Sequence, residues 1–459
     1  MDQVVTILLG VIGLFFVLGF GGFALISMIE GEHRAMKLSS GLMLLSGAIF
    51  LLAVFMPFMA KVVLLGLLVF CGLIMIVLFV LPVGKIKAGN DEPYKRVDER
   101  DIPFARARLE AGSPEFEAYY KMRPGNKPID DRFRSKPGLL SPEARFADPF
   151  QFSATEGSFW LTDGLRAAVD GPVSEERHTL PVGEMTKFLK SLARFYGALD
   201  VGISELKPYH VYSHIGRGTG VYGDTISVDH SYAIAFTVEM DFYMIGPSPY
   251  PPTSMETGKQ YVEAARIAVQ LAAAIRYLGY SARAHIDGNY RVIAPLVARD
   301  AGLGEIGRMG LLMTPQQGPR VRIGVVTTDV ELAADHRQMA PSVIDFCSVC
   351  KKCAQNCPSK SIPQGERETI EGALRWKINA NNCFLYWNVV GTDCAKCMAV
   401  CPYSHPDTFS HNLIRWGNSK SGAFRRAALR LDDLFYGKKP GPRDAPGWTV
   451  VGNPQNPRL

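Results

Sequence analysis

The stretch C-S-V-C-K-K-C-A-Q-N-C-P at residues 347–358 constrains this chain more than any other feature of its sequence. Its cysteines are separated by two, two and three residues, and a proline follows the last. Bacterial two-cluster ferredoxins bind iron–sulfur clusters with this C-x2-C-x2-C-x3-C-P spacing. Zinc is the alternative, but structural zinc sites usually join two separated cysteine pairs. The spacing and the soft thiolate ligands therefore favour iron–sulfur.

A second set of cysteines lies downstream, and a proline again follows the last of them. This set consists of Cys383, Cys394, Cys397 and Cys401. In two-cluster ferredoxins the fourth cysteine of each run binds the other cluster, so we expect two [4Fe–4S] clusters with crossed ligands. The first cluster is assigned to Cys347, Cys350, Cys353 and Cys401. The second cluster is assigned to Cys357, Cys383, Cys394 and Cys397. Cys383 is the least constrained ligand, because ten residues separate it from Cys394, and a buried structural thiol is the alternative.

Cysteine usage and charge narrow the class of protein further. Eight of the nine cysteines are clustered, whereas disulfide frameworks spread them through small secreted domains. The ninth, Cys71, lies in an apolar run, and we assign it no role. The clustering indicates a compartment in which thiols stay reduced. A net charge of +6 is too small for a nucleic-acid-binding surface, so no nucleic acid partner is expected.

Three uncharged runs near the N-terminus predict a membrane anchor over residues 1–88. They are Gln3–Ile29, Leu38–Ala60 and Val62–Gly84. Each has the roughly 20 residues that a helix needs to cross a bilayer. A cleaved signal peptide is a poor fit, because its apolar region is shorter and follows a basic stretch. We therefore expect a multi-pass membrane protein with the lipid bilayer as a partner.

Basic residues predict the orientation of this anchor. The first loop carries Arg34 and Lys37, whereas the second loop offers only Lys61. The segment after the third run carries Lys85, Lys87, Lys95 and Arg96. Lys and Arg accumulate in cytoplasmic loops. With three spans, the first loop and the rest of the chain share one side. The body of the chain is therefore expected in the cytoplasm, in agreement with reduced thiols.

The body of the chain reads as a mixture of helices and strands. Residues 89–180 are rich in Pro, Gly and charge and predict an irregular wrapping segment with short helices. The apolar spacing that follows predicts two helices, Glu184–Tyr196 and Glu256–Leu278, the latter ending at Gly279. Three strands are predicted at Ala233–Val238, Leu311–Thr314 and Val321–Thr328, the last two joined across 316–319. We expect an α/β or α+β core over 181–335, a ferredoxin-like domain over 336–420, and a tail over 421–459 packed on the core.

Two glycine-rich stretches match the dinucleotide fingerprint only superficially. They are G-L-G-E-I-G at Gly302–Gly307 and G-T-G-V-Y-G at Gly218–Gly223. The fingerprint requires a strand before it and a helix after it, and neither stretch has that context. Close approach of the backbone to a large ligand and a plain tight turn both remain open.

The order of motifs resembles the reductive dehalogenases, a family of corrinoid and iron–sulfur enzymes. The resemblance covers residues 95–440. It is carried by ARFYGALDVGISEL at 193–206, AIAFTVEMD at 233–241, IRYLGYSA at 275–282, AGLGEIGRMG at 301–310, FCSVCKKCAQNCPSKSI at 346–362, CAKCMAVCPYSHP at 394–406 and LDDLFYGKKP at 431–440. It implies a nitroreductase-like core that binds cobalamin, with Gly302 and Gly304 as candidate corrinoid contacts, and a ferredoxin-like insertion.

The resemblance also implies three catalytic residues: Tyr261 as proton donor, Asn289 beside it, and Arg322 near the substrate. A free phenol has a pKa of about 10, so it is a weak acid at neutral pH. A nearby guanidinium is expected to stabilise the phenolate and lower that pKa, and an amide can orient the phenol. Without the resemblance, Tyr261 would be read as a helix-surface ring and Arg322 as a solvated strand residue.

The predicted function is reductive dehalogenation of a small organohalide with two electrons and one proton. The electron donor is left open between reduced ferredoxin, flavodoxin and a membrane quinol route. The alternatives are a corrinoid reductase similar to epoxyqueuosine reductase, which uses an acidic proton donor, and a membrane-bound ferredoxin that only transfers electrons. The latter leaves residues 180–335 without a purpose.

Overall fold

The computed structural model describes residues 1–80, 88–337 and 340–451. Lys85 and Lys87, on which the predicted orientation partly rests, lie outside these residues. The chain forms two compact units. The anchor unit combines Met1–Ile86 with Thr408–Asp444, and the core unit combines Lys87–Asp407 with Ala445–Leu459.

The anchor unit contains the predicted membrane helices. They are α1 (Asp2–Ile29), α2 (His33–Val54) and α3 (Phe58–Val80). Among the described residues, these three helices are long and apolar enough to cross a membrane. The break between α2 and α3 falls at 55–57 rather than at Lys61, because Pro57 has no amide hydrogen to continue α2. Lys61 lies inside α3, where its Nζ is 3.0 Å from Asp2 Oδ1 at the start of α1.

The structure divides the C-terminal tail differently from the sequence prediction. Helices α16 (Phe409–Lys420) and α17 (Gly422–Phe435) belong to the anchor unit, and Ala445–Leu459 belongs to the core unit. Phe424 of α17 packs edge-on against Phe79 of α3, with ring centres 4.8 Å apart. These aromatic contacts bury the apolar face of α17 against the membrane helices. The amphipathic pattern of this segment was visible in the sequence, but not the surface on which it packs.

The core unit is built on an antiparallel sheet. Within the described residues its strands are β1 (Val201–Glu205), β2 (Tyr232–Glu239), β6 (Val321–Thr328) and β3 (Ala282–His285), in the order β1-β2-β6-β3. Side chains alternate between the two faces, so Ile234 and Phe236 of β2 enter one buried cluster and Ala233 and Ala235 enter another.

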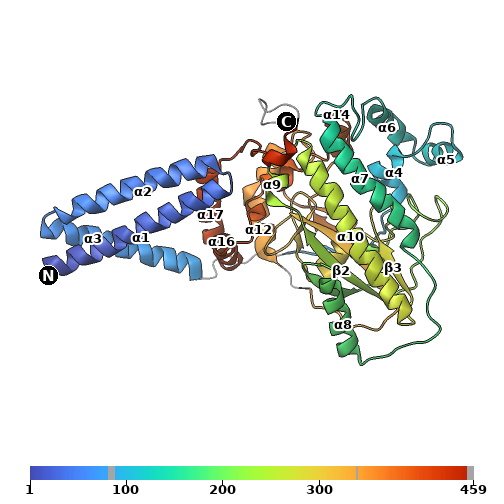
Figure 1. Cartoon of the computed structure of the whole chain (residues 1–459), viewed down its shortest axis with the longest axis horizontal. Coiled ribbons are helices and arrows are strands. Elements are labelled where there is room, and N and C mark those ends of the chain that lie inside the picture. Colours follow the sequence, from blue (N-terminus) through green and yellow to red (C-terminus); the bar gives the residue numbers. More distant parts are fainter. Residues whose placement is uncertain (81–87, 338–339, 452–459) are drawn as a thin grey trace. The chain divides into compact units, whose positions relative to one another are not determined.

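Helices cover both faces of this sheet. Helices α8 (Val182–Phe195) and α10 (Pro252–Tyr277) bury one face, and α11 (Ala294–Asp300) buries the other. Figure 1 shows α10 running across the strands. Gly279 follows α10 with φ +84°, as expected for a glycine that ends a helix. The predicted mixture of helices and strands is confirmed, and so are both predicted helices.

Two sequence predictions need correction. The strand β5 (Leu312–Met313) pairs with β4 (Glu305–Ile306), so it is not a neighbour of β6 in the central sheet. The predicted wrapping segment contains α7 (Pro149–Leu165), a 17-residue helix that lies along α10. The N-terminal half of α7 buries Phe152 and Thr155, and this packing gives the segment regular structure that its composition does not suggest.

The remaining elements are short. They are α4 (Pro103–Ala107), α5 (Pro114–Met122), α6 (Lys127–Arg134), α9 (Phe242–Ile245), α12 (Pro341–Cys350), α13 (Lys352–Asn356), β7 (Glu368–Ile370), β8 (Ala373–Arg375), α14 (Ala380–Val390) and α15 (Lys396–Ala399). Seven of the eight clustered cysteines lie on α12 to α15 or on the loops between them, and Cys401 follows α15.

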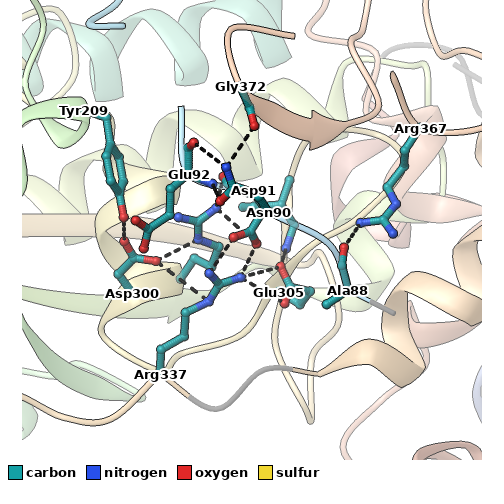
Figure 2. Close-up of polar contacts among 12 residues, drawn as sticks. Ala88, Asn90, Asp91, Glu92, Tyr209, Asp300, Glu305, Arg337, Arg367 and Gly372 are labelled. Carbon is teal, nitrogen blue, oxygen red and sulfur yellow. Dashed lines mark hydrogen bonds and ion pairs between the residues drawn. The ribbon is translucent and has the colours of Figure 1, made fainter. Parts of the chain in front are cut away.

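A buried ionic network fixes the start of the core unit. Arg337 forms ion pairs with Asp91, with Glu305 and with Asp300 (Figure 2). Asp300 also accepts a hydrogen bond from the Tyr209 hydroxyl. Asp91 belongs to the first described residues of this unit, so the network ties residues 88–92 to α11 and β4.

Candidate active site

Tyr261 and Arg322 meet between α10 and the central sheet. The guanidinium carbon of Arg322 lies 4.7 Å from the centre of the Tyr261 ring, so the cation faces the π system. Tyr261 comes from the third turn of α10, and Arg322 comes from β6 opposite Val238 of β2. The Arg322 side chain is only 19% exposed, which rules out a solvated strand residue.

A carboxylate holds the guanidinium in place. Arg322 Nη2 donates to Thr257 Oγ1 at 2.8 Å and lies 3.4 Å from Asp393 Oδ2. Asp393 also accepts hydrogen bonds from the hydroxyls of Thr257, Thr253 and Ser254 in the first turns of α10. Sequence reasoning missed Asp393 and Thr257. Three hydroxyl residues lie on one face at the start of a helix: Thr253, Ser254 and Thr257. That spacing is the sequence feature that could have indicated a buried polar partner such as Asp393.

Burial dominates the acid–base properties of this site. Burial raises the pKa of the Tyr261 phenol, and the charge of Arg322 lowers it only in part. The expected sign of the guanidinium effect is therefore present, but the expected net lowering is wrong. Burial raises the pKa of Asp393 as well, against the opposing charge of Arg322. At neutral pH the Tyr261 hydroxyl carries its proton.

Some polar atoms at the site lack protein partners. Among the described residues, no hydrogen bond reaches the Tyr261 hydroxyl, and the buried Nε of Arg322 has no hydrogen-bond partner. Buried donors in folded proteins are nearly always hydrogen-bonded. An unsatisfied donor beside a phenol therefore indicates a place for a bound group.

Among the described residues, no contact joins the Asn289 side chain to the Tyr261 phenol. Its Oδ1 accepts from Arg283 Nη2 at 2.9 Å and from the Thr219 backbone N–H at 3.3 Å. Its Nδ2 donates to the Arg166 carbonyl oxygen at 3.2 Å. The side chain is fully buried and its amide is used to hold the Gly-rich loop at 218–223. An orienting contact from Asn289 to Tyr261 stays a prediction.

Contacts and backbone conformation within this chain explain why glycine occupies positions 302 and 304. Gly302 follows α11 with φ +80°, and the Leu303 N–H returns to the Ala298 carbonyl to close the helix end. A Cβ at Gly304 would lie 2.3 Å from the Met313 carbonyl oxygen, so the glycine permits β4 to approach β5. The tight-turn alternative accounts for both positions, and corrinoid contact stays a prediction.

The cysteine thiols of the ferredoxin-like segment lie near one another, and their division into the two predicted ligand sets stays a prediction. Burial raises the pKa of the Cys401 thiol, and the nearby thiols of Cys347 and Cys350 raise it further. Cys401 is thus close to the first run, from which it is more than forty residues distant in sequence.

The second group forms around Cys383. Burial raises the pKa of Cys383 to about 11, with a contribution from Cys357. Burial also raises the pKa of Cys397, and Cys394 and Cys383 add to that shift. Cys383 therefore has the other three predicted ligands as neighbours. Buried thiols with raised pKa values fit a cation that deprotonates them on binding.

A cavity of about 260 Å³ lies beside the second cysteine group. Its lining includes Arg322 and Asp393 together with Cys357, Cys383 and Cys397. Most of the other lining side chains are apolar. They include Phe104, Met309, Leu311, Ile362, Trp387 and Met398. The Arg322 guanidinium, which faces Tyr261, and the second cysteine group therefore border the same largely apolar cavity.

Comparisons with known proteins agree with this arrangement. A family model described as a 4Fe-4S dicluster domain matches residues 346–405. The tetrachloroethene reductive dehalogenase of Dehalobacter restrictus is 36% identical over 213 residues, which cover 44% of this chain and 38% of the relative. That of Sulfurospirillum multivorans is 32% identical over 292 residues, which cover 56% of this chain and 58% of the relative.

A solved reductive dehalogenase structure, described as suggesting a mechanism for B12-dependent dehalogenation, is 25% identical to this chain with a TM-score of 0.61. The match covers 77% of this chain and 49% of that one. The core unit has the reductive dehalogenase fold. The family resemblance and the iron–sulfur domain predicted from the motifs are confirmed. The chain spans 38% to 58% of the length of these curated reductive dehalogenases.

Proposed function

We propose that this chain is a reductive dehalogenase that replaces a carbon–halogen bond with a carbon–hydrogen bond. The reaction consumes two electrons and one proton and releases halide. One observation carries the proposal: the cavity that is lined by Arg322 is also lined by cysteines of the second group. Reductive cleavage needs an electron route and an acid at the same place, and a simple electron carrier needs no acid.

The residues present fit the cofactors that this function requires. The eight clustered cysteines could hold two [4Fe–4S] clusters, and the unsatisfied Arg322 Nε leaves a donor for the polar amide rim of a corrinoid. A bound corrinoid supplies the electrons that reach the carbon–halogen bond. Met309 and Leu311 from the β4–β5 segment, with Met398 from α15, would form its apolar surroundings.

The protein's own contribution is a positioned proton. The Tyr261 hydroxyl gives its proton to the carbon from which halide leaves, and the resulting phenolate faces the Arg322 guanidinium. Because Tyr261 is protonated at neutral pH, the donor form is fully populated. Arg322 offsets part of the cost of the buried phenolate, and Asp393 and Thr257 keep the guanidinium in position. A positioned general acid contributes roughly 10²–10⁴-fold to the rate.

The arrangement argues against an acidic donor of the kind expected for an epoxyqueuosine reductase-like enzyme. The carboxylate in the site, Asp393, accepts hydrogen bonds from Thr253, Ser254 and Thr257 and pairs with Arg322. Its oxygens are engaged as acceptors, whereas the Tyr261 hydroxyl is available. Tyrosine is therefore the better donor.

The testing experiment is Tyr261→Phe, with Tyr290→Phe as the matched control. Burial raises the pKa of the Tyr290 phenol, and the Tyr261 phenol contributes to that shift, so the two rings are neighbours. Tetrachloroethene, named as the substrate of the relatives, is the first substrate to test, with a chemical reductant in place of the unknown donor. We expect Tyr261→Phe to lower turnover by at least about a hundredfold with corrinoid and iron content unchanged. Tyr290→Phe should retain turnover within a few-fold.

Turnover of Tyr261→Phe near the wild-type value would remove Tyr261 from the mechanism. Failure of the wild-type protein to release halide from any organohalide, although both cofactors are bound, would overturn the proposed reaction class.

We also propose that the core unit faces the cytoplasm. The basic residues at the start of α2, Arg34 and Lys37, and the clustering of the cysteines in the sequence support this side. A cytoplasmic location admits reduced ferredoxin or flavodoxin as electron donor, and the membrane anchor admits a quinol route.

A further inference from the structure

The C-terminal helices α16 and α17 are packed on the ends of the membrane helices and leave an apolar stripe uncovered. We propose that residues 408–436, here called the collar, lie in the membrane interface and bind phospholipid. The collar would then anchor the protein in addition to the three spans. This inference goes beyond the proposed catalytic function and does not depend on it.

The exposed stripe follows one side of α16. Phe409, Leu413 and Trp416 are 85%, 43% and 46% exposed, and Lys420 continues the same line. Their spacing of four, three and four residues places them on one face of a helix. Arg415 and Asn418 on other faces of α16 are buried, so the helix exposes its apolar side and covers polar positions. That inversion is characteristic of a helix lying at a lipid surface.

Contacts within the anchor unit place this stripe at the depth of the bilayer interface. The Trp416 ring lies 4.9 Å from the ring of Phe79, next to the last residue of α3. A Cβ at Gly417 would lie 2.9 Å from the Phe79 ring, so glycine permits this close approach. Tryptophan is enriched where membrane helices leave the hydrocarbon. Trp416 therefore marks the plane in which the stripe lies.

The other end of the collar is fixed to α1 and α2. Phe435 packs edge-on against Phe23 of α1 with ring centres 5.0 Å apart. Arg34 Nε, in the first turn of α2, donates to the Leu434 carbonyl oxygen at 3.1 Å. His411 of α16 lies 2.9 Å from Glu30 at the end of α1. The collar is thus held at the bundle end where α1 and α3 finish and α2 begins.

Charge identifies lipid as the occupant of this surface. The exposed basic side chains of the collar and the residues just after it are Lys420, Arg426, Arg430, Lys438 and Lys439. Lys and Arg at this level bind headgroup phosphates, most strongly those of anionic lipids. The stripe meets α3 where Trp416 contacts Phe79, and the apolar windows of α1, α2 and α3 are 0% to 11% buried. A bilayer that surrounds those helices reaches the stripe without a further partner.

The test is photocrosslinking in the full-length protein. The photoreactive residue p-benzoylphenylalanine is placed at Leu413, at Ser419, or at Leu14 in the middle of α1. Ser419 is exposed on the same helix but away from the stripe, and Leu14 is exposed on a span. Each protein is reconstituted in nanodiscs of phosphatidylglycerol and phosphatidylcholine in equal amounts. After irradiation, intact-mass spectrometry measures the phospholipid adduct.

We expect phospholipid adducts at positions 413 and 14, with severalfold less at position 419. The collar proposal would be overturned if the protein labelled at position 14 formed adducts but the protein labelled at position 413 formed no more than the protein labelled at position 419. The three membrane spans would then still stand. Absence of adducts at 14 would show that the helices do not enter the bilayer, which also overturns the proposal. In native membranes, a crosslink from 413 to a protein instead of lipid would count against lipid as the occupant. None of these outcomes depends on dehalogenase activity.

Discussion

Asp393 Oδ2 lies 3.4 Å from Arg322 Nη2, and Asp393 is the residue immediately before Cys394. A single residue thus connects the guanidinium that faces the proton donor with the cysteine group that is expected to hold the second cluster. Cys394 has φ +65° and Ala395 has φ +47°, both in the left-handed region that is costly for residues with a Cβ. The hydrogen bonds from Asp393 to the first turns of α10 help to hold this unusual backbone.

The first prediction follows from that connection. Asp393→Asn keeps the size of the side chain, but its one amide oxygen can replace only one of the two carboxylate oxygens, which accept from Ser254 and from Thr257. The variant also loses the charge that pairs with Arg322. We expect turnover to fall roughly tenfold or more, because removal of a hydrogen-bonded ion-pair partner costs about 1.5–3 kcal/mol. Steady-state kinetics and iron content measure the effect. Loss of iron from the variant would instead indicate that Asp393 mainly supports the cysteine loop.

Arg322→Lys tests the geometry of the guanidinium. Lysine keeps the positive charge but lacks the planar fork that reaches Thr257 while facing Tyr261. The Arg322 charge offsets part of the rise in the Tyr261 pKa. A cation that no longer faces the ring offsets less of it, so the phenol pKa rises further and Tyr261 becomes a poorer acid. Proton transfer should then limit the rate more strongly. We expect lower turnover and a larger solvent deuterium isotope effect in Arg322→Lys, and a still larger effect in Arg322→Met. Unchanged isotope effects in both variants would contradict the role of Arg322 in proton transfer.

Cys383→Ser tests the least constrained cluster ligand. Two [4Fe–4S] clusters correspond to about eight iron atoms per chain in the wild-type protein. The variant should lose iron only from the second cluster, because Cys383 has Cys357, Cys394 and Cys397 as its thiol neighbours. Iron and sulfide assays with electron paramagnetic resonance would measure this loss. Cys71→Ser is the control, since Cys71 is exposed on α3, and its iron content should equal that of the wild type.

The clusters illustrate what sequence reasoning can predict. Cysteine spacing predicted the 4Fe-4S dicluster domain at 346–405, because metal chemistry dictates ligand type and spacing, and the two ligand sets stay a prediction. Helix α10 and strand β2 were also predictable, since their apolar patterns are long or bounded by clear end signals. Tyr261 and Arg322 followed from the family resemblance, and the sequence alone would have read them as surface residues.

Long-range packing explains the remaining differences. Asp393 acquires its role only when the loop before Cys394 meets α10, and no local pattern encodes that meeting. Strand β5 pairs with β4 rather than joining the central sheet, because Gly304 lets these two backbones approach. The collar has an amphipathic sequence that fits either unit, so only its contacts with Phe23 and Phe79 assign it to the anchor.

Membrane orientation gives the fourth prediction. A cytoplasmic-active reporter fused after Asn90 should be active, because the loop that carries Arg34 and Lys37 is expected on the same side. A reporter fused after Met56, between α2 and α3, should show the opposite location. The paired fusions control for expression, since both contain α1 and α2. Periplasmic activity at Asn90 together with cytoplasmic activity at Met56 would reverse the proposed orientation.

The ionic network of Figure 2 predicts acid sensitivity of the core unit. Burial raises the pKa of Asp91, but the hydrogen bond and charge of Arg337 outweigh burial, and the net shift is downward. The pKa of Asp300 is also lowered, because hydrogen bonds from His210 and Arg299 outweigh its burial. Carboxyl groups with lowered pKa values stabilise the folded state above their unfolded pKa of about 4. That contribution is lost as the pH falls through the folded pKa values.

Arg337→Met removes the central cation of this network and leaves the buried carboxylates of Asp91 and Glu305 less well paired. We expect the free energy of unfolding at pH 7 to fall by roughly 3 kcal/mol, the order seen when one partner of a buried ion pair is removed. The difference from wild type should shrink as the pH falls below about 4, because the unfolded carboxyls of Asp91 and Asp300 then bind protons that the folded wild-type protein, with its lowered pKa values, does not yet bind. Denaturant unfolding followed by tryptophan fluorescence at several pH values measures both effects.

Arg177→Met is the control, because its partner Asp329 is 3.9 Å away and both side chains are exposed, so the change in the free energy of unfolding should be below about 1 kcal/mol. A difference between Arg337→Met and wild type that stays constant down to pH 3 would show that packing of the arginine, rather than its charge, stabilises this region.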